Sequence, residues 1–481
     1  MAHDASLYLA IDQGGHASRA IVFDALGEVV AEAFVEVQTT YPQPGWVEHD
    51  PRAVVESIDV AINQVVKGLG PRVADVTAAG LATQRSSLVC WDRVTGEALS
   101  PVISWQDHRA ARWLEQFKGS AAAVHEQTGL VISAHYGASK LRWCLDHLPE
   151  VGEALQENHL AWGPLVSFLL FRILAERPLL VDPANAARTL LWDLRTRDWT
   201  QALLDLFGLP REPLPMCVPS RHPCGHLRVG SRAVPLVVAT GDQSAALYAF
   251  GDPRPDTVYV NVGTGAFVQR VVGDQPVAAP RLLSSVVWQE ADRATYTLEG
   301  AVNGAGSALD QVRTELGLDT HDADAQTARW LEEPCDPPLF LNGVSGLGSP
   351  FWVSDFPSRF VGNGEARERI VAVAESIVFL LKVNLDELAA HGPEPDRLLI
   401  TGGLAAMDGL CQRLADLSGM QVERPQARQA TARGLAYLVA GQPPHWQPQS
   451  SVTDFRPAQN PALRKRFDRW HTQMLAALNK R

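Results

Sequence analysis

The sequence predicts an α/β protein whose two halves face each other across a cleft. Two stretches far apart in the chain, residues 7–23 and 257–272, share one pattern: an apolar strand, a glycine-rich turn and a returning strand. A further glycine pair, Gly402-Gly403, separates an apolar run at 397–401 from a helical pattern at 405–418. The repeated pattern indicates that each half begins with the same supersecondary unit.

Composition narrows the class of protein. A chain of 481 residues is too long for one ordinary core, which favours two or three domains. Its 46% hydrophobic and 20% charged residues are typical of a soluble globular protein. A net charge of −12 argues against general nucleic-acid binding. No apolar run approaches the ~20 residues of a membrane span, and the N-terminus does not resemble a signal peptide.

The cysteine pattern favours a reducing compartment. Six cysteines are spread along the chain without the regular spacing of a disulfide framework, so we expect a cytoplasmic protein. Cys217, His222, Cys224 and His226 lie within ten residues, but their spacing matches no common zinc pattern. We therefore expect no structural metal there.

The first half can be assigned in order. Strands are predicted at 7–11, 20–23 and 29–37, with the turn Asp12–Ser18 between the first two. Asp50-Pro51 has the N-cap and first-turn residues of a helix, whose apolar face repeats from 54 to 65. Further strands are expected at 78–82 and 88–91. Residues 105–209 are more helical, with helical spacing at 135–148 and 165–175, and are interpreted as an insertion that supplies substrate contacts.

Asp242 and Gln243 lie on a tight turn between a strand at 235–239 and a small, apolar helical stretch at 244–250. Open α/β folds place their chemistry at such strand-to-helix turns. A carboxylate there can accept a proton, and the neighbouring amide can orient a hydroxyl. Asp242 could equally cap the helix that follows, and the local pattern leaves both functions open. Two glycine-rich hairpins facing one cleft could bind the phosphates of a nucleotide through backbone N–H groups.

Motifs from about Leu7 to Gly441 make the chain resemble the FGGY family of carbohydrate kinases, and within it the glycerol kinases. The matching stretches are Gln84-Arg85 with Trp91-Asp92, 105–109, 138–143, 185–189, 241–243, 263–267, 298–302, 346–352, Gly402-Gly403 and 422–425. The resemblance implies two actin-like (ribonuclease H-like) ATPase domains with a cleft between them. It implies an enzyme that uses ATP and Mg²⁺ to phosphorylate a hydroxyl group of a small polyol or sugar.

The expected domain limits are 1–250 for the N-terminal domain, which carries the substrate pocket and the insertion around 105–209, then 251–445 for the mainly nucleotide-binding C-terminal domain. Residues 446–481 are expected to form a C-terminal extension. The resemblance leaves a homodimer or a homotetramer open, and it implies neither a nucleic-acid nor a membrane partner.

The resemblance also implies residue roles. Asp242 would be the general base and Asp12 would act through Mg²⁺. The expected substrate contacts are Arg85, Ser86, Trp105, His135, Asp242, Gln243 and Phe267. The expected nucleotide contacts are Gly14, Gly15, His16, Gly263, Thr264, Gly265, Gly306, Asp310, Gly402, Gly403 and Asp408. A structural alternative stays open for Trp105 and Phe267 as core residues, and for Arg85 as part of an ion pair.

The chain departs from the family pattern at several positions. Gly15 and His16 replace two hydroxyl residues in the first phosphate hairpin, and Ser86 stands where glycerol kinases have a Glu. His135 replaces a Tyr that contacts substrate, Thr401 an Asp, and Asp408 an Asn. Because the changes at 86 and 135 lie in the polyol pocket, we expect a substrate other than glycerol.

Two alternatives compete with a carbohydrate kinase. Gly15 and His16 favour a catalytically weak homologue that binds a ligand and acts as a regulator, whereas retention of Asp12 and Asp242 opposes it. The other alternative is a nucleotide hydrolase or chaperone of the same actin-like type. Arg85, Trp105 and Asp242 argue against it, because a chaperone needs no polyol pocket.

Overall fold

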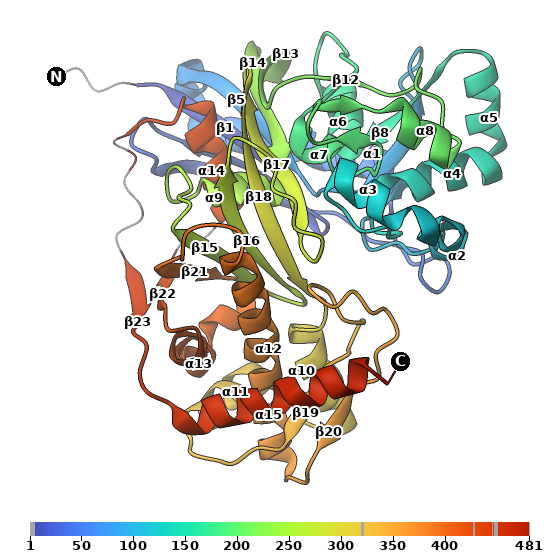
Figure 1. The fold of residues 1–481 in the computed structure, drawn as a ribbon. Helices are drawn as coiled ribbons and strands as arrows, with labels where there is room; N and C mark the ends of the chain where they lie inside the picture. Colours follow the sequence, from blue (N-terminus) through green and yellow to red (C-terminus); the bar gives the residue numbers. More distant parts are fainter. Residues whose placement is uncertain (1–4, 319–321, 427–428, 445, 447–450, 481) are drawn as a thin grey trace.

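The computed structural model describes residues 5–318, 322–426, 429–444, 446 and 451–480, and confirms the α/β class. Each of two domains is built on one mixed sheet (Figure 1). The N-terminal sheet has the spatial order β13 (Arg221–Val229), β14 (Arg232–Gly241), β5 (Val76–Thr83), β1 (Leu7–Gln13), β2 (Ala17–Phe23) and β3 (Val29–Glu36).

The register of this sheet brings three loops to one edge. The hairpin β1–β2 is antiparallel, whereas β5 runs parallel to both β1 and β14. Asp12 lies opposite Ala82, which in turn lies opposite Thr240. Parallel strands end at the same edge of a sheet, so the residues that follow β1, β5 and β14 emerge side by side.

The C-terminal sheet repeats this arrangement. Its order is β17 (Leu283–Glu290), β18 (Arg293–Val302), β16 (Ala266–Gly273), β15 (Thr257–Val262), β21 (Arg397–Thr401), β22 (Gln421–Pro425) and β23 (Val452–Phe455). Again the opening hairpin β15–β16 is antiparallel and the next two strands, β21 and β22, run parallel to the first. The turn 263–265 and the glycine pair 402–403 therefore leave the sheet at one edge.

The segment at 105–209 is tied to strands that precede it. A four-stranded sheet joins β4 (Glu48–His49), β7 (Val102–Ile103), β6 (Leu88–Asp92) and β8 (Leu160–Pro164). Two-stranded pairs join β10 (Trp192–Asp193) to β11 (Asp198–Trp199), and β9 (Leu180–Val181) to β12 (Met216–Cys217). The helices are α2 (Ala111–Leu114), α3 (Ala121–Thr128), α4 (Gly137–His147), α5 (Pro149–Gln156), α6 (Leu165–Ile173), α7 (Pro183–Ala186) and α8 (Gln201–Phe207), with a 3₁₀ turn at Glu115–Ser120. Most of the predicted helical spacing falls on α4 and α6.

Helices from both ends of the chain cover the N-terminal sheet. The predicted helix α1 (Pro51–Leu69) begins at the N-cap Asp50, whose side chain accepts from the Arg52 backbone N–H at 2.8 Å, and a 3₁₀ turn at Gly70–Asp75 follows it. Its apolar face packs on β2 and β3. The helix α14 (Ala430–Val439) packs against β1 and β5, and α9 (Asp242–Leu247) packs against α14, β14 and β5. The late helix α14 thus covers the first sheet (Figure 1).

The C-terminal domain holds its own core. Its helices are α10 (Gly306–Glu315), α11 (Ala323–Glu332), α12 (Ala366–Ala389), α13 (Asp408–Ser418) and α15 (Pro461–Leu478), with β19 (Leu339–Leu341) paired to β20 (Arg359–Val361) and a 3₁₀ turn at Gly403–Ala406. The expected helix at 405–418 thus splits in two. The predicted C-terminal extension, 446–481, includes α15, which packs Trp470 into this core and from which Arg466 donates to Glu375 at 2.6 and 2.7 Å.

Gly434 holds α14 close to the helix that begins with Asp242. A Cβ at Gly434 would lie 1.8 Å from the Ala245 carbonyl oxygen, and because that oxygen belongs to the backbone it cannot rotate out of the way. Gly152, in the solvated helix α5, has open space around the same position. We expect Gly434→Ala to lower the free energy of unfolding by about 1–3 kcal/mol, whereas Gly152→Ala raises it by about 0.5–1 kcal/mol. Equal denaturant midpoints for the two variants would contradict this packing.

Candidate functional site

Three polar residues gather at one edge of the N-terminal sheet. Asp12 lies near the end of β1, Arg85 follows β5, and Asp242 follows β14. Asp242 is the first residue of α9, and the N-cap position belongs to Gly241, so Asp242 is not the N-cap residue of this helix. Its Oδ1 accepts from the Gln243 backbone N–H at 2.7 Å. Burial raises the pKa of Asp242 above its ordinary value, and the nearby Arg85 charge offsets part of that rise. Asp242 is therefore a stronger base than an exposed aspartate.

Arg85 joins the substrate loop to the other domain. Its Nη2 donates to Oε1 of Gln243, and its Nη1 lies 3.3 Å from Oε1 of Glu299 on β18. Arg188, just after α7, donates to the other oxygen of Glu299. All three charged side chains are buried. The structural alternative and the substrate role of Arg85 are thus compatible, because the ion pair fixes the guanidinium beside Gln243 and Asp242.

Glu299 stays ionised between the two arginines. Burial by itself raises the pKa of Glu299, but the charges of Arg188 and Arg85 and their hydrogen bonds lower it to about 2. For Arg85, burial lowers the pKa and the neighbouring Arg188 adds to that effect, while Glu299 opposes it. One carboxylate thus holds two buried guanidinium groups in place.

Asp12 is a buried carboxylate that forms one ion pair within the described part of the chain. Its Oδ2 lies 3.1 Å from Nη1 of Arg19, a partly exposed side chain. Burial raises the pKa of Asp12 to about 6; Arg19 counteracts this, and the negative charge of Asp242 adds to it. An undercompensated carboxylate is the kind of ligand that Mg²⁺ takes together with substrate phosphates, so Asp12 fits the expected metal. Among the described residues no three His, Cys, Asp or Glu side chains form a metal cluster.

A second wall of the site is built around Lys140 of α4. Its buried Nζ donates to the backbone carbonyl oxygens of Ser86, at 2.9 Å, and His135, at 2.7 Å. Ser86 has a positive φ of 64°, and its buried Oγ has no hydrogen-bond partner among the described residues. The ring of His135 lies 5.5 Å from that of Trp105. Lys140 thus ties together two loops that hold predicted substrate contacts.

The electrostatics of this wall keep His135 neutral. Burial lowers the pKa of His135 well below its ordinary value, and the positive charges of Lys140, Arg188 and Arg85 lower it further. Burial also lowers the pKa of Lys140 to about 7, although Asp107 opposes the shift. A neutral imidazole beside Trp105 can accept or donate one hydrogen bond to a polyol hydroxyl.

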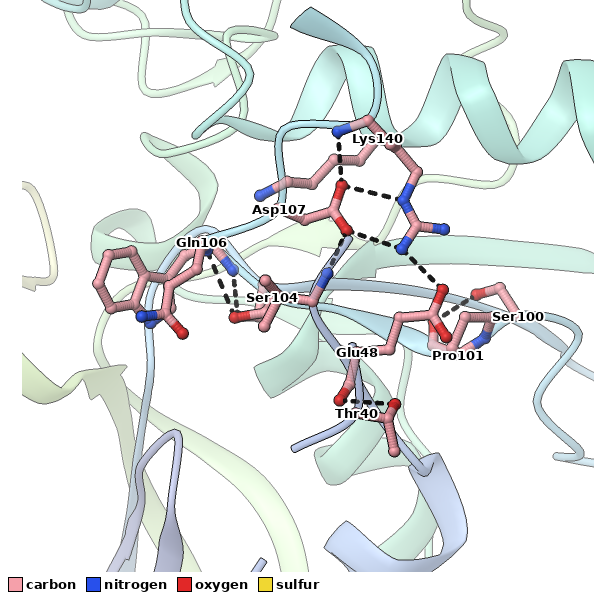
Figure 2. A network of polar contacts seen from close by, with 12 residues as sticks. Thr40, Glu48, Ser100, Pro101, Ser104, Gln106, Asp107 and Lys140 are labelled. Carbon is pink, nitrogen blue, oxygen red and sulfur yellow. Dashed lines mark hydrogen bonds and ion pairs between the residues drawn. The ribbon is translucent and has the colours of Figure 1, made fainter. Parts of the chain in front are cut away.

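Behind Trp105 a polar network fixes the loop at 104–109. Oδ2 of Asp107 accepts from the Val47 backbone N–H at 2.7 Å and from Nη2 of Arg109 at 2.7 Å. Arg109 also reaches Oε1 of Glu48 at 2.7 Å. Figure 2 shows the Asp107 carboxylate between Lys140 and Glu48. The network connects the loop that carries Trp105 to the segment of Val47 and Glu48.

The glycine turns form close backbone contacts. The Gly306 N–H donates to the Gly263 carbonyl at 2.9 Å, and a Cβ at Gly306 would lie 2.8 Å from that oxygen. Gly402 has a φ of 97°, and a Cβ there would lie 2.4 Å from the Val262 carbonyl oxygen. A side chain at Gly403 would meet no atom within 4 Å. These turns bring bare backbone to one edge of the C-terminal sheet, as a phosphate site requires.

The remaining predicted contacts lie in different settings. Gly14 closes the first hairpin through its N–H to the Ala17 carbonyl at 2.9 Å, Gly15 is half-buried, and His16 is exposed. Gly265 and Thr264 share the turn with Gly263, and Phe267 is half-buried on β16. Asp310 and Asp408 lie at the surface, where each forms an ion pair with an arginine, Arg313 and Arg424 respectively. No contact among the described residues links either aspartate to Asp242.

Sequence reasoning assigned no role to Glu299, Arg188 or Lys140, although all three stand in matching motifs. A signal was present: Glu299 is the lone charge in an apolar run of β18, and a buried charge needs a partner. The side chains of the Cys217–His226 cluster have separate partners. Nδ1 of His226 lies 2.6 Å from Oε1 of Glu176, and Cys224 is buried in the core.

The fold carries an unfavourable charge at Asp12. Because its folded pKa of about 6 exceeds the ordinary 3.8, the folded state binds the proton more tightly, and stability falls as pH rises through this window. We expect Asp12→Asn to stabilise the ligand-free protein by about 1–3 kcal/mol at pH 8, a gain that vanishes near pH 4. Chemical denaturation across this pH range measures it, with the exposed Asp310→Asn as control. A destabilised Asp12→Asn at pH 8 would contradict the burial argument.

Comparisons with known proteins agree with this architecture. Residues 7–249 match the N-terminal domain of the FGGY family of carbohydrate kinases, and residues 258–441 match its C-terminal domain. The glycerol kinase of Alkalilimnicola ehrlichii is 36% identical over 442 residues, covering 90% of this chain and 89% of that protein. That of Symbiobacterium thermophilum is 33% identical over 455 residues, covering 93% and 91%.

Solved structures match the fold over nearly its whole length. Plasmodium falciparum glycerol kinase with ADP has a TM-score of 0.88 at 22% identity, covering 98% of each chain. A xylulose kinase from Brucella ovis has a TM-score of 0.87 at 22% identity, covering 98% of this chain and 99% of that one.

In the described part of the chain, no helix has the length and apolar character needed to span a membrane. The chain belongs to the FGGY family of carbohydrate kinases, enzymes that phosphorylate a hydroxyl group of a sugar or polyol.

Proposed function

We propose that this enzyme transfers the γ-phosphoryl group of ATP to a hydroxyl of a small polyol or sugar, with Asp242 as the general base. The observation that carries the proposal is the position of Asp242: at the start of α9, half-buried, with Arg85 and Gln243 fixed beside it. Burial raises the pKa of Asp242, which makes this carboxylate a stronger proton acceptor than an exposed aspartate. A well-placed base contributes ~10²–10⁴ in rate.

The chain's own residues would orient the acceptor. Arg85 and Gln243 offer hydrogen-bonding groups beside Asp242, and Trp105 and His135 belong to the second wall, which Lys140 holds. A polyol hydroxyl held between them would give its proton to Asp242 as its oxygen attacks phosphorus and the bond to the β-phosphate oxygen breaks. Positioning and charge neutralisation dominate such transfers.

The glycine turns would hold the nucleotide. Backbone N–H groups at Gly14 and Gly15 on one domain, and at 263–265 and 402–403 on the other, suit the phosphates and the adenosine side of ATP. Asp12 would hold Mg²⁺, which neutralises phosphate charge when bound. Binding between the two domains is the reason to expect closure on ligand.

The acceptor is proposed to be larger than glycerol. Ser86 has no charge, and its buried hydroxyl lacks a protein partner. A four- or five-carbon polyol or a ketose would fill the space that a longer carboxylate takes in glycerol kinases, and its additional hydroxyl would satisfy Ser86. The two relatives at 33% and 36% identity are glycerol kinases, which makes glycerol the competing acceptor.

The base is tested with Asp242→Asn, which keeps the shape of the side chain. We expect kcat to fall by about 100-fold or more, while the affinity for Mg-ATP stays nearly unchanged. Coupled ADP release gives kcat, and the thermal shift with Mg-ATP gives binding and confirms folding. A folded variant with most of its turnover would refute Asp242 as base. If the wild-type protein binds Mg-ATP but turns over no acceptor, the alternative of a ligand-binding regulator gains support.

The acceptor is tested by side-by-side kinetics. We expect a four- or five-carbon polyol or a ketose to exceed glycerol in kcat/KM, because loss of a charged hydrogen bond worth about 1.5–3 kcal/mol lowers glycerol specificity by roughly tenfold to a hundredfold. The variant Ser86→Glu should shift the preference toward glycerol, with the same change at an exposed serine, Ser451→Glu, as the control. If glycerol is the best acceptor of the wild-type enzyme, the argument from Ser86 is wrong.

A further inference from the structure

A row of buried polar groups connects the first glycine hairpin to the loop that carries Trp105. The Trp105 N–H donates to Oγ of Ser87 at 3.1 Å, and that hydroxyl donates to Oε1 of Gln84 at 3.0 Å. The Gln84 side-chain amide donates to Oε1 of Gln13 at 3.5 Å, and the Gln13 amide donates to the Gly14 carbonyl oxygen at 2.7 Å. We call these five residues the polar relay. It joins a predicted nucleotide contact, Gly14, to a predicted acceptor contact, Trp105.

Every hydrogen bond of the polar relay points the same way. In each one the donor lies on the Trp105 side and the acceptor on the Gly14 side. Ser87, Gln84 and Gln13 are at most 1% exposed, so a broken link would leave a buried polar group without a partner. Hydrogen bonds aligned in this way polarise one another in the protein interior. A change at one link therefore weakens its neighbours as well.

The polar relay holds both ends of the turn at 84–87. At one end the Gln84 backbone N–H donates to the Gln13 carbonyl oxygen at 2.8 Å, because β5 runs parallel to β1. At the other end the Ser87 hydroxyl both donates and accepts. Between these ends lie Arg85 and Ser86, two predicted acceptor contacts. The hydrogen bonds of Gln84 and Ser87 thus set the position of residues that would touch the acceptor.

The amide of Gln84 also lies against the first glycine hairpin. A Cβ at Gly15 would lie 3.8 Å from Oε1 of Gln84, an ordinary van der Waals distance. Gln13 is the last residue of β1, and Gly14 opens the turn that follows. A phosphate group that fixed the backbone at Gly14 and Gly15 would therefore also fix this end of the polar relay.

We propose that Gln84 and Ser87 are positioning residues through which nucleotide binding and acceptor binding strengthen each other. The inference rests on the proposed function for the identity of the two ligands. A ligand that orders one end of the polar relay has already met part of the entropy cost of ordering the other end. By thermodynamic linkage the acceptor raises the affinity for nucleotide by the same factor as the nucleotide raises the affinity for acceptor.

The physical connection is tested on the ligand-free protein by hydrogen–deuterium exchange. Ser87→Ala should speed the exchange of backbone amides at 104–107, and also at 13–17, by about tenfold or more. The matched control is Ser100→Ala. The buried Ser100 hydroxyl also accepts from a backbone N–H, that of Cys90 at 2.9 Å, and donates to an oxygen, that of Pro101 at 2.9 Å. This control should leave exchange at 13–17 as in the wild type, and thermal unfolding confirms that each variant is folded.

The coupling is measured by calorimetry with Mg-AMP-PNP, an ATP analogue that blocks transfer, alone and with glycerol, xylitol or xylulose. We expect at least one of these three acceptor probes to raise the affinity of the wild type for Mg-AMP-PNP by about fivefold or more. The factor should fall toward one in Ser87→Ala and in Gln84→Met. It should persist in Ser100→Ala and in Ser87→Thr, which keeps the hydroxyl.

Three results would overturn the proposal. The first is equal exchange at 13–17 in the wild type and Ser87→Ala, which would remove the physical connection. The second is an unchanged coupling factor in both Ser87→Ala and Gln84→Met. The third is a wild type whose affinity for Mg-AMP-PNP none of the three probes changes. Neither measurement uses turnover, so a protein that shows the connection and the coupling but transfers no phosphoryl group would contradict the proposed function alone.

Discussion

The bridge of Glu299 to Arg85 and Arg188 is the interaction on which the proposed substrate site depends. Removing one partner of a buried ion pair costs about 3–5 kcal/mol, since it leaves an uncompensated charge in a medium that solvates it poorly. Here the carboxylate comes from the C-terminal sheet, and both guanidinium groups come from the N-terminal half. The position of Arg85 beside Asp242 therefore depends on the relative placement of the two domains.

Strand direction explains why the chemistry gathers where it does. In each sheet an antiparallel hairpin is followed by two strands parallel to its first member. The ends of these parallel strands deliver Asp12 and Asp242 in one domain, and the bare turns at 263 and 402 in the other. One topology used twice thus supplies carboxylates to one face and backbone N–H donors to its counterpart, a division suited to an acceptor hydroxyl and a polyphosphate.

Local patterns predicted this arrangement well where a residue acts through its own segment. The hairpins at Asp12 and Gly263, and the turn before Asp242, follow from apolar runs broken by glycine. Glu299 and Lys140 escaped assignment because their partners are distant in sequence: Arg85 lies 214 positions from Glu299, and Ser86 lies 54 from Lys140. The periodicity of a single sequence reports which residues share a face of one element, and it does not predict which distant residues form a pair. The docking of α14 on the first sheet is hidden for the same reason.

Two neighbouring aspartates show how burial is turned to function. Burial raises the pKa of Asp242, and the charge of the neighbouring Arg85 cancels only part of that rise. The carboxylate is therefore more basic than an exposed aspartate. Asp12 has a weaker counter-charge, the partly exposed Arg19, and also faces the charge of Asp242. The two carboxylates therefore repel each other when both are ionised. A cation held by Asp12 would reduce this repulsion and would favour the ionised form of Asp242, the form that the proposed base role requires.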